Sequence, residues 1–170
     1  MPLVTALRAL NQLKRRRVIR DYAVIGAVAA GLYVGPLATA DLDITVLVDS
    51  DEEYLRLFGR VRAEAERMEG MHLYFGGVPV QMLPTTTKPL YADALRTARP
   101  ARAGTVRLRV ARPEHLVLLA LDAFRPKDRA RAAALLELAD RRRLRRLLRR
   151  FDDEKETLAA RLRWLSGAPV

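Results

Sequence analysis

The sequence contains no cysteine, which excludes disulfide frameworks and thiolate metal sites. Its two histidines, His72 and His115, lie too far apart for zinc-type spacing, and we interpret them as ordinary residues. No run approaches the roughly 18 uninterrupted apolar residues of a membrane span. Residues 1–17 place their positive charge after the apolar positions, the reverse of a secretory signal. We therefore expect a cytoplasmic protein that does not enter a membrane.

Positive charge and apolar side chains are abundant. Half of the 170 residues are apolar, enough for the core of one ordinary domain with a small helical appendage. The formal net charge is +11, from 31 Lys plus Arg against 20 Asp plus Glu. Such an excess indicates polyanionic partners such as nucleotides or nucleic acid, or it reflects the arginine and alanine usage of a GC-rich genome.

Hydrophobic periodicity predicts a mixed α/β (α+β) core followed by a helical C-terminal third. We expect an α/β core over residues 1–111 and a helical region over 112–170 packed on it, or one single domain. The predicted helices cover 3–17, 27–34, 50–68, 89–97, 113–124, 127–150 and 152–165. The predicted strands cover 22–26, 42–48, 72–75, 78–83 and 106–110, with Gly76-Gly77 as a hairpin turn or as a bulge in one strand.

Two aspartates stand at the start of one predicted strand. Asp41 and Asp43 are two residues apart, so their carboxylates project from the same face. Such like charges need water, a cation or a structural partner. The pair either holds a metal ion or serves in turn chemistry before the strand.

The surrounding segment resembles the nucleotidyltransferase fold associated with DNA polymerase beta. That family has a strand ending in glycine and a small residue, a short helix, and an Asp-hydrophobic-Asp strand. Here Gly26-Ala27 is followed by thirteen residues and then by Asp41-Leu42-Asp43-Ile44. YAVIGAVAAGLYVGPLATADLDI and the later LRVARPEHLVLLALDAFRPKD are also similar to the bacterial group named after the AbiEii toxin of toxin–antitoxin systems. The resemblance covers roughly residues 18–140.

The resemblance implies nucleotidyl transfer with Mg²⁺ (or Mn²⁺) as cofactor. It assigns metal binding and catalysis to Asp41 and Asp43, because hard cations bind carboxylate and phosphate oxygens. By the same resemblance, the nucleotide-binding residues are Gly26, Ala27, Thr39, Gln81, Arg125, Lys127 and Asp128. The partners that the resemblance implies are a nucleoside triphosphate and an antitoxin protein. The arginine-rich run over 141–150 suggests RNA or tRNA as the acceptor, and a protein or a small molecule stays open as an alternative acceptor.

Several family positions are altered. Alanine follows Gly26 where glycine or serine is usual, and Leu37 replaces an arginine. Gln81 stands where a third carboxylate is expected, and an amide brings no charge to a cation. Ala120 replaces a lysine and Arg131 replaces an aspartate. The sequence therefore leaves two hypotheses open, an active transferase and a degenerate protein that binds nucleotide or nucleic acid without transfer. A third hypothesis is a structural basic protein with an accidental aspartate pair.

An arginine-rich run covers residues 141–150. Leu144, Leu147, Leu148 and Phe151 form the apolar stripe of a packed helix. Its arginines form either a solvated face opposite an acidic helix at 152–156 or a contact to nucleic-acid phosphates through Arg142, Arg145, Arg146 and Arg149. We expect Trp164, together with Leu158, Leu162 and Leu165, to anchor the last helix on the core.

Overall fold

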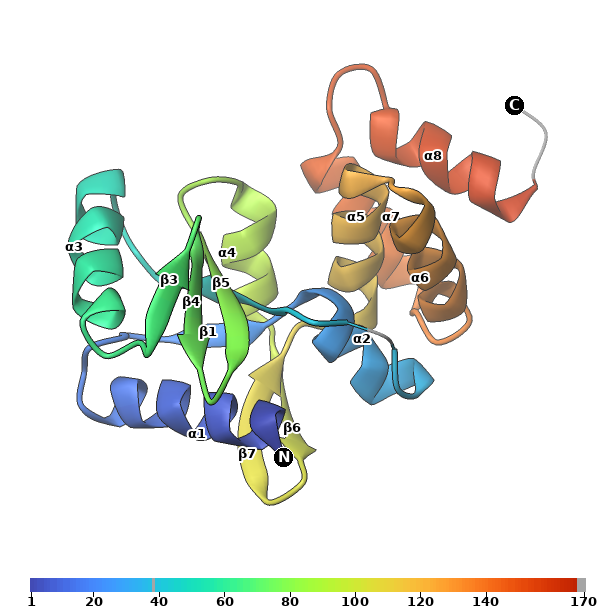
Figure 1. The fold of residues 1–170 in the computed structure, drawn as a ribbon. Coiled ribbons are helices and arrows are strands. Elements are labelled where there is room, and N and C mark those ends of the chain that lie inside the picture. Colours follow the sequence, from blue (N-terminus) through green and yellow to red (C-terminus); the bar gives the residue numbers. More distant parts are fainter. Residues whose placement is uncertain (38, 168–170) are drawn as a thin grey trace.

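The fold of the chain, a computed structural model that describes residues 1–37 and 39–167, is built on one seven-stranded mixed sheet (Figure 1). The strand order is β3-β4-β5-β2-β1-β7-β6. The strands are β1 (Tyr22–Val24), β2 (Leu42–Val46), β3 (Arg67–Glu69), β4 (His72–Phe75), β5 (Val78–Pro84), β6 (Arg99–Ala103) and β7 (Val106–Val110). The helices are α1 (Pro2–Arg15), α2 (Gly26–Val34), α3 (Asp51–Arg62), α4 (Pro89–Arg96), α5 (Pro113–Ala123), α6 (Pro126–Leu136), α7 (Arg141–Phe151) and α8 (Thr157–Ser166).

The strand β2 lies in the middle of the sheet. It runs antiparallel to β1 and parallel to β5. Leu42 and Ile44 are fully buried, whereas Asp43 between them is only partly buried, as expected for side chains that alternate between the two faces of a strand. Asp43 is thereby exposed to a cleft while its neighbours hold the strand in the core.

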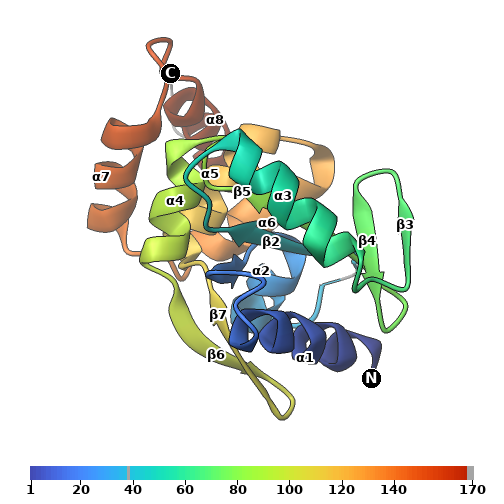
Figure 2. The same ribbon diagram turned by 90° about the vertical axis from the view of Figure 1, so that its left-hand side faces the viewer.

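Helices pack on both sides of the sheet. The helix α1 contacts β4, β5 and β7, and α4 contacts β1 and β2 from the opposite side (Figures 1 and 2). The helices α5 to α8 gather into a separate cluster beside the sheet, with α2 between the two parts (Figure 1). Buried residues of both parts belong to one continuous hydrophobic core. The predicted division near residue 111 stays a prediction.

The predicted fold class is confirmed, and the two segments around Gly76-Gly77 form a hairpin, the first of the two alternatives. Two other expectations were wrong in detail. The helix predicted over 50–68 ends at Arg62, because residues 67–69 form the edge strand β3 on β4. The sequence also did not predict β6, which pairs with β7. Both strands, β3 and β6, form because they pair with a neighbouring strand, and their local sequence pattern does not indicate them.

The single helix predicted over 127–150 is wrong, since α6 ends at Leu136 and α7 starts at Arg141. The side chain of Asp140 accepts a hydrogen bond from the Arg143 N–H at 2.8 Å and begins the new helix. The buried Glu114 in turn accepts the Asp140 N–H at 2.8 Å. A capping aspartate that is held by a distant glutamate therefore breaks the helix.

The end of the chain also differs from the expectation. Residues 152–156 form a turn rather than an acidic helix, and the Asp152 carboxylate accepts the N–H groups of Leu158 and Ala159 in the first turn of α8. Trp164 is 61% exposed, so it does not anchor α8 in the core as predicted. The leucine part of the prediction is confirmed, since Leu158 is buried and Leu162 and Leu165 pack partly buried against the core. No helix in the described part of the chain is long and apolar enough to cross a membrane.

Candidate functional site

A row of polar side chains crosses three neighbouring strands. Asp43 on β2 pairs in register with Gln81 on β5, and Gln81 pairs with His72 on β4. Paired residues on adjacent strands project from the same face of a sheet. The structure therefore brings Gln81 beside Asp43, at the place where the resemblance expects a third carboxylate.

Gly26 lies directly against Asp43. A Cβ atom at Gly26 would lie 2.2 Å from Oδ2 of Asp43, and the backbone φ of Gly26 is +67°. Both features require glycine, because any other residue would be strained and would displace the carboxylate. Gly26 is also the first residue of α2, whose N-terminus has no side-chain cap. Uncapped N–H groups at a helix N-terminus are suited to bind an anion such as a phosphate.

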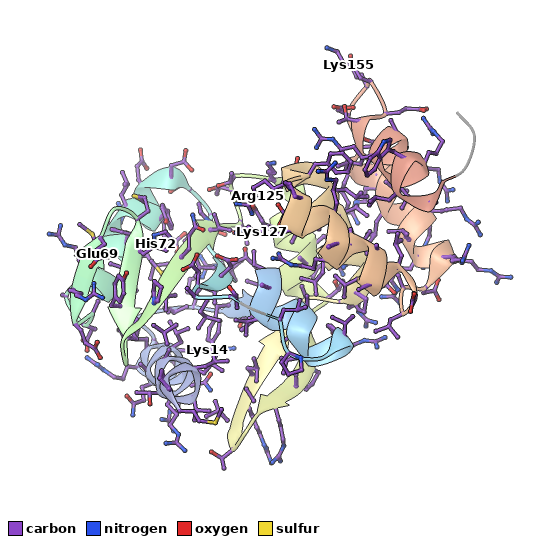
Figure 3. The ribbon with its side chains drawn as sticks, turned by 45° about the vertical axis from the view of Figure 1, so that its right-hand side comes forward. Lys14, Glu69, His72, Arg125, Lys127 and Lys155 are labelled. Carbon is purple, nitrogen blue, oxygen red and sulfur yellow. The ribbon has the colours of Figure 1, made fainter. Side chains whose placement is uncertain are left out.

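A small cavity of about 150 Å³ lies between the sheet and the helical cluster. We call it the cleft. Asp43, Gln81 and Gly26 line its sheet side, and Arg125, Asp128 and Arg131 of the α6 region line its opposite side. Apolar side chains, among them Leu83, Leu116, Leu119 and Ala120, complete the wall together with Tyr91. In Figure 3, Arg125 lies at the edge of the helical cluster that faces the sheet carrying His72.

The electrostatics of the cleft centre on Asp43. Burial, followed by the charge of Asp41, raises the pKa of Asp43 above its ordinary value. The charges of Arg131, His72 and Arg125 act in the opposite direction. The ionised carboxylate of Asp43 is therefore destabilised in the cleft, and binding a cation or a proton would stabilise it.

The arginines of the cleft are held by Asp128, whose side chain is 1% exposed. Its Oδ2 accepts Nε of Arg125 at 2.6 Å, and its Oδ1 lies 3.5 Å from Nη1 of Arg131. Burial alone would raise the pKa of Asp128, but the hydrogen bond and charge of Arg125, with Arg131, lower it overall. Asp128 therefore positions both guanidinium groups toward the cleft rather than offering a free carboxylate.

Other predicted residues lie around the cleft rather than in its lining. Asp41 directly precedes β2, and Thr39 exchanges hydrogen bonds with its backbone at 3.2 and 3.3 Å. Ala27 is buried in the first turn of α2. Lys127 is exposed in the first turn of α6, close to Arg125 (Figure 3).

Sequence reasoning passed over His72, which the structure places in the row beside Gln81. Its position depends on the pairing of β4 with β5, which no local signal reveals. Arg131 was noted only as a departure from the family pattern, and the structure makes it part of the cleft wall.

The arginines of α7 divide into two groups. Leu144 and Leu147 are buried, which confirms the predicted apolar stripe. Arg146 and Arg149 line a second hollow, whereas Arg142 and Arg145 are exposed outside it. Among the residues that the structure describes, the carboxylate of Asp93 is the one acidic partner of an α7 arginine, and it lies 3.3 Å from Nη1 of Arg150. The acidic segment 152–156 does not neutralise this helix.

No protein-family model matches the chain, and no curated protein matches it in sequence. Solved structures do match its fold. An antigenic nucleotidyltransferase-like protein from Paracoccidioides brasiliensis superposes with a TM-score of 0.65 at 16% identity, over 96% of this chain and 86% of that one. ANT(2")-Ia in complex with adenylyl-2"-tobramycin superposes with a TM-score of 0.56 at 13% identity, over 96% of this chain and 99% of that one. The chain therefore has a nucleotidyltransferase-like fold, with a mixed seven-stranded sheet flanked by helices.

Proposed function

We propose that the protein transfers a nucleoside monophosphate from a nucleoside triphosphate to an acceptor, with the reaction taking place in the cleft. The observation that carries this proposal is the meeting of three groups around one cavity. Asp43 provides a carboxylate, and the backbone of Gly26 lies directly against it. Arg125 provides a guanidinium group on the opposite wall. A fold shared with a protein that holds an adenylylated compound supports the same reaction class.

The donor set of the cleft fits Mg²⁺ that arrives together with the triphosphate. The described residues contain no group of three His, Cys, Asp or Glu side chains able to hold a metal ion by themselves. Mg²⁺ is commonly held by one or two carboxylates together with substrate phosphates and water. Asp41 and Asp43 would supply the carboxylates and Gln81 an amide oxygen. When bound, the ion would stabilise negative charge on the reacting phosphate oxygens.

The remaining groups bind and orient the triphosphate. The N–H groups at the start of α2 and the guanidinium groups of Arg125 and Arg131 receive its phosphates. Leu116, Leu119 and Tyr91 exclude water on the other sides. The acceptor oxygen bonds to the α-phosphorus, pyrophosphate leaves, and the acceptor hydroxyl releases its proton. The side chain of Gln81 is an amide and cannot accept that proton. We therefore assign the role of proton acceptor to the imidazole of His72 in the same row.

The acceptor that we propose is RNA, with tRNA as the favoured form, in the cytoplasm. The net charge of +11 supports a polyanionic acceptor. The exposed arginines of α7 provide a surface for its phosphates: Arg142, Arg145, Arg146 and Arg149. The role of a toxin held in check by an antitoxin protein rests on the AbiEii-type resemblance alone. Induced expression in growing cells tests it, because a toxin slows growth and loses this effect in an Asp43→Ala variant.

The decisive experiment measures incorporation of labelled nucleoside triphosphates into RNA pools in the presence of Mg²⁺. We expect incorporation by the natural protein and its loss in an Asp41→Ala/Asp43→Ala variant. A Glu52→Ala/Glu154→Ala variant removes the same charge at exposed positions outside the cleft and should stay active. Incorporation that survives the double aspartate change would exclude the assigned roles.

A second function is favoured by the altered residues of the cleft. Gln81 and Arg131 replace carboxylates that the family pattern expects, which reduces the negative charge available to a metal, and Ala120 replaces an expected lysine. On this view the protein binds nucleotide or nucleic acid without transfer. Calorimetry separates the two functions. Triphosphate binding that is equal with Mg²⁺ and with EDTA, and that yields no product, would support the second one. Binding that requires Mg²⁺ supports the transferase.

A further inference from the structure

A second hollow, separate from the cleft, lies between α4, α5 and α7. It has a volume of about 490 Å³. Five arginines line it: Arg96, Arg143, Arg146, Arg149 and Arg150. We propose that this arginine hollow binds a chain of closely spaced phosphate groups. The proposal does not depend on nucleotidyl transfer in the cleft.

The floor of the arginine hollow is a buried acid–base pair. Asp93 is 5% exposed and His115 is 1% exposed, and Nε2 of His115 lies 2.8 Å from Oδ2 of Asp93. The other oxygen of Asp93 holds two of the arginines, Arg96 at 2.5 Å and Arg150 at 3.3 Å. The one acidic side chain of the hollow is therefore fully engaged. Asp93 holds the guanidinium groups of Arg96 and Arg150 above the floor. The other three arginines of the lining therefore have no carboxylate of the hollow to pair with.

The lining of the hollow carries a large unbalanced charge. Five arginines against Asp93 leave a formal charge of +4 (5 − 1). Glu114 and Asp140 are close in sequence to these elements, but they lie outside the lining and accept backbone N–H groups. The guanidinium groups of Arg143, Arg146 and Arg149 make no ion pair within the described part of the chain.

Two neighbours of the hollow, the partly buried Arg112 and the buried His115, are affected by the same excess of positive charge. Burial, and then the charges of Arg143 and Arg99, lower the pKa of Arg112. Nη1 of Arg112 and Nδ1 of His115 are both buried without a hydrogen-bond partner. Burial also lowers the pKa of His115 despite its hydrogen bond to Asp93, and Arg143 acts in the same direction. Both groups lie at the start of α5, and both experience the positive charge of Arg143 on α7.

Phosphate is the ligand chemistry that fits this lining. The planar guanidinium group donates two parallel hydrogen bonds to phosphate oxygens, and several such groups recognise linked phosphates. No Phe, Tyr or Trp is among the residues that line the hollow, and the imidazole of His115 is buried, so the hollow offers no surface for stacking bases. Recognition through phosphates alone is independent of base sequence. The phosphates can belong to a nucleic-acid strand or to a free inorganic oligophosphate.

Two matched double variants test the proposal. Arg146→Gln/Arg149→Gln changes the hollow, whereas Arg62→Gln/Arg102→Gln removes the same charge at exposed positions of α3 and β6 outside it. The probes are inorganic tripolyphosphate and an abasic phosphodiester dodecamer, and binding is measured by calorimetry at 50 and 200 mM salt. Circular dichroism confirms that both variants are folded.

We expect the hollow variant to bind at least about tenfold more weakly and the control variant to change by less than about threefold. For the dodecamer, the slope of log affinity against log salt should fall by about 1.4, for two lost phosphate contacts at roughly 0.7 each. A loss confined to the dodecamer identifies a nucleic-acid strand, and a loss confined to tripolyphosphate identifies a free oligophosphate. An Asp43→Asn variant should retain binding, which separates this site from the cleft.

Three results would overturn the proposal. Equal losses in the two double variants would show a nonspecific effect of net charge. If the natural protein binds neither probe, the hollow is not a phosphate-binding site. Equally tight binding of a poly-glutamate of matched charge, lost in the same variant, would show that the hollow takes an acidic protein segment instead.

Discussion

Asp43 and Gln81 occupy paired positions on the neighbouring parallel strands β2 and β5. The central carboxylate of the cleft therefore has an amide beside it on the same face of the sheet. An amide neither repels the carboxylate nor adds charge for a cation. We predict that this pairing limits the affinity of the cleft for a metal ion.

Gln81→Asp should increase the affinity for Mn²⁺ in the absence of nucleotide by about tenfold or more, because a third carboxylate joins Asp41 and Asp43. Electron paramagnetic resonance of added Mn²⁺ measures this directly. Gln12→Asp, on the exposed side of α1, provides the control for added negative charge. An unchanged Mn²⁺ affinity would show that residue 81 does not face the metal position.

Asp43→Asn should raise the melting temperature at pH 7 by about 2–4 °C in metal-free buffer. The pKa of Asp43 is raised in the folded protein, so folding takes up a proton between the ordinary pKa and the raised one. The free energy of unfolding of the natural protein therefore falls as the pH rises through that window, and it stays lower above it. Asparagine carries no charge and avoids this loss.

Thermal melts from pH 3 to pH 8 test that expectation. The stability gained by Asp43→Asn should shrink toward pH 3, where Asp43 of the natural protein is protonated. A variant that is less stable at pH 7, or a difference that is independent of pH, would contradict it.

Gly26→Ala should destabilise the protein and abolish triphosphate binding. The left-handed backbone of Gly26 costs an alanine roughly 1–2 kcal/mol, and the added Cβ would also collide with Oδ2 of Asp43. Gly70→Ala is the matched control, because Gly70 has a φ of +57° but has no atom within 4 Å of an added Cβ. Denaturant unfolding should show a clearly larger loss at position 26. Equal losses would mean that backbone strain alone accounts for the effect.

Asp128→Ala should lower the free energy of unfolding by roughly 2–4 kcal/mol at pH 7, because a buried carboxylate that holds Arg125 and Arg131 is lost. The pKa of Asp128 is lowered in the folded protein, so its contribution is present above its ordinary pKa and disappears as the pH falls through the lowered value. Urea unfolding at pH 7 and at pH 3 should show the gap between the two proteins narrowing in acid. If the difference in the free energy of unfolding between the two proteins is the same at both pH values, the ionised carboxylate of Asp128 is not the source of the stabilisation.

Local patterns predicted much of the fold. The spacing of Gly26 and Asp41 indicated the strand, helix and strand that the structure contains. The absence of this arrangement would have supported the hypothesis of an accidental aspartate pair. Buried strands and amphipathic helices have periodic patterns that are visible in the sequence. The edge strand β3 and the break between α6 and α7 escaped prediction, because they depend on contacts with β4 and with Glu114.

The sequence by itself determined the charge of the protein, the order of its main elements and the aspartate pair at the start of β2. Only the tertiary structure decided that His72 lies in a row with Gln81 and Asp43, and that Arg131 faces them. It also divided the arginines of α7 between a hollow and the open surface. The physical reason is that strand register and helix docking join residues far apart in the chain, and their energies come from packing that no local pattern encodes.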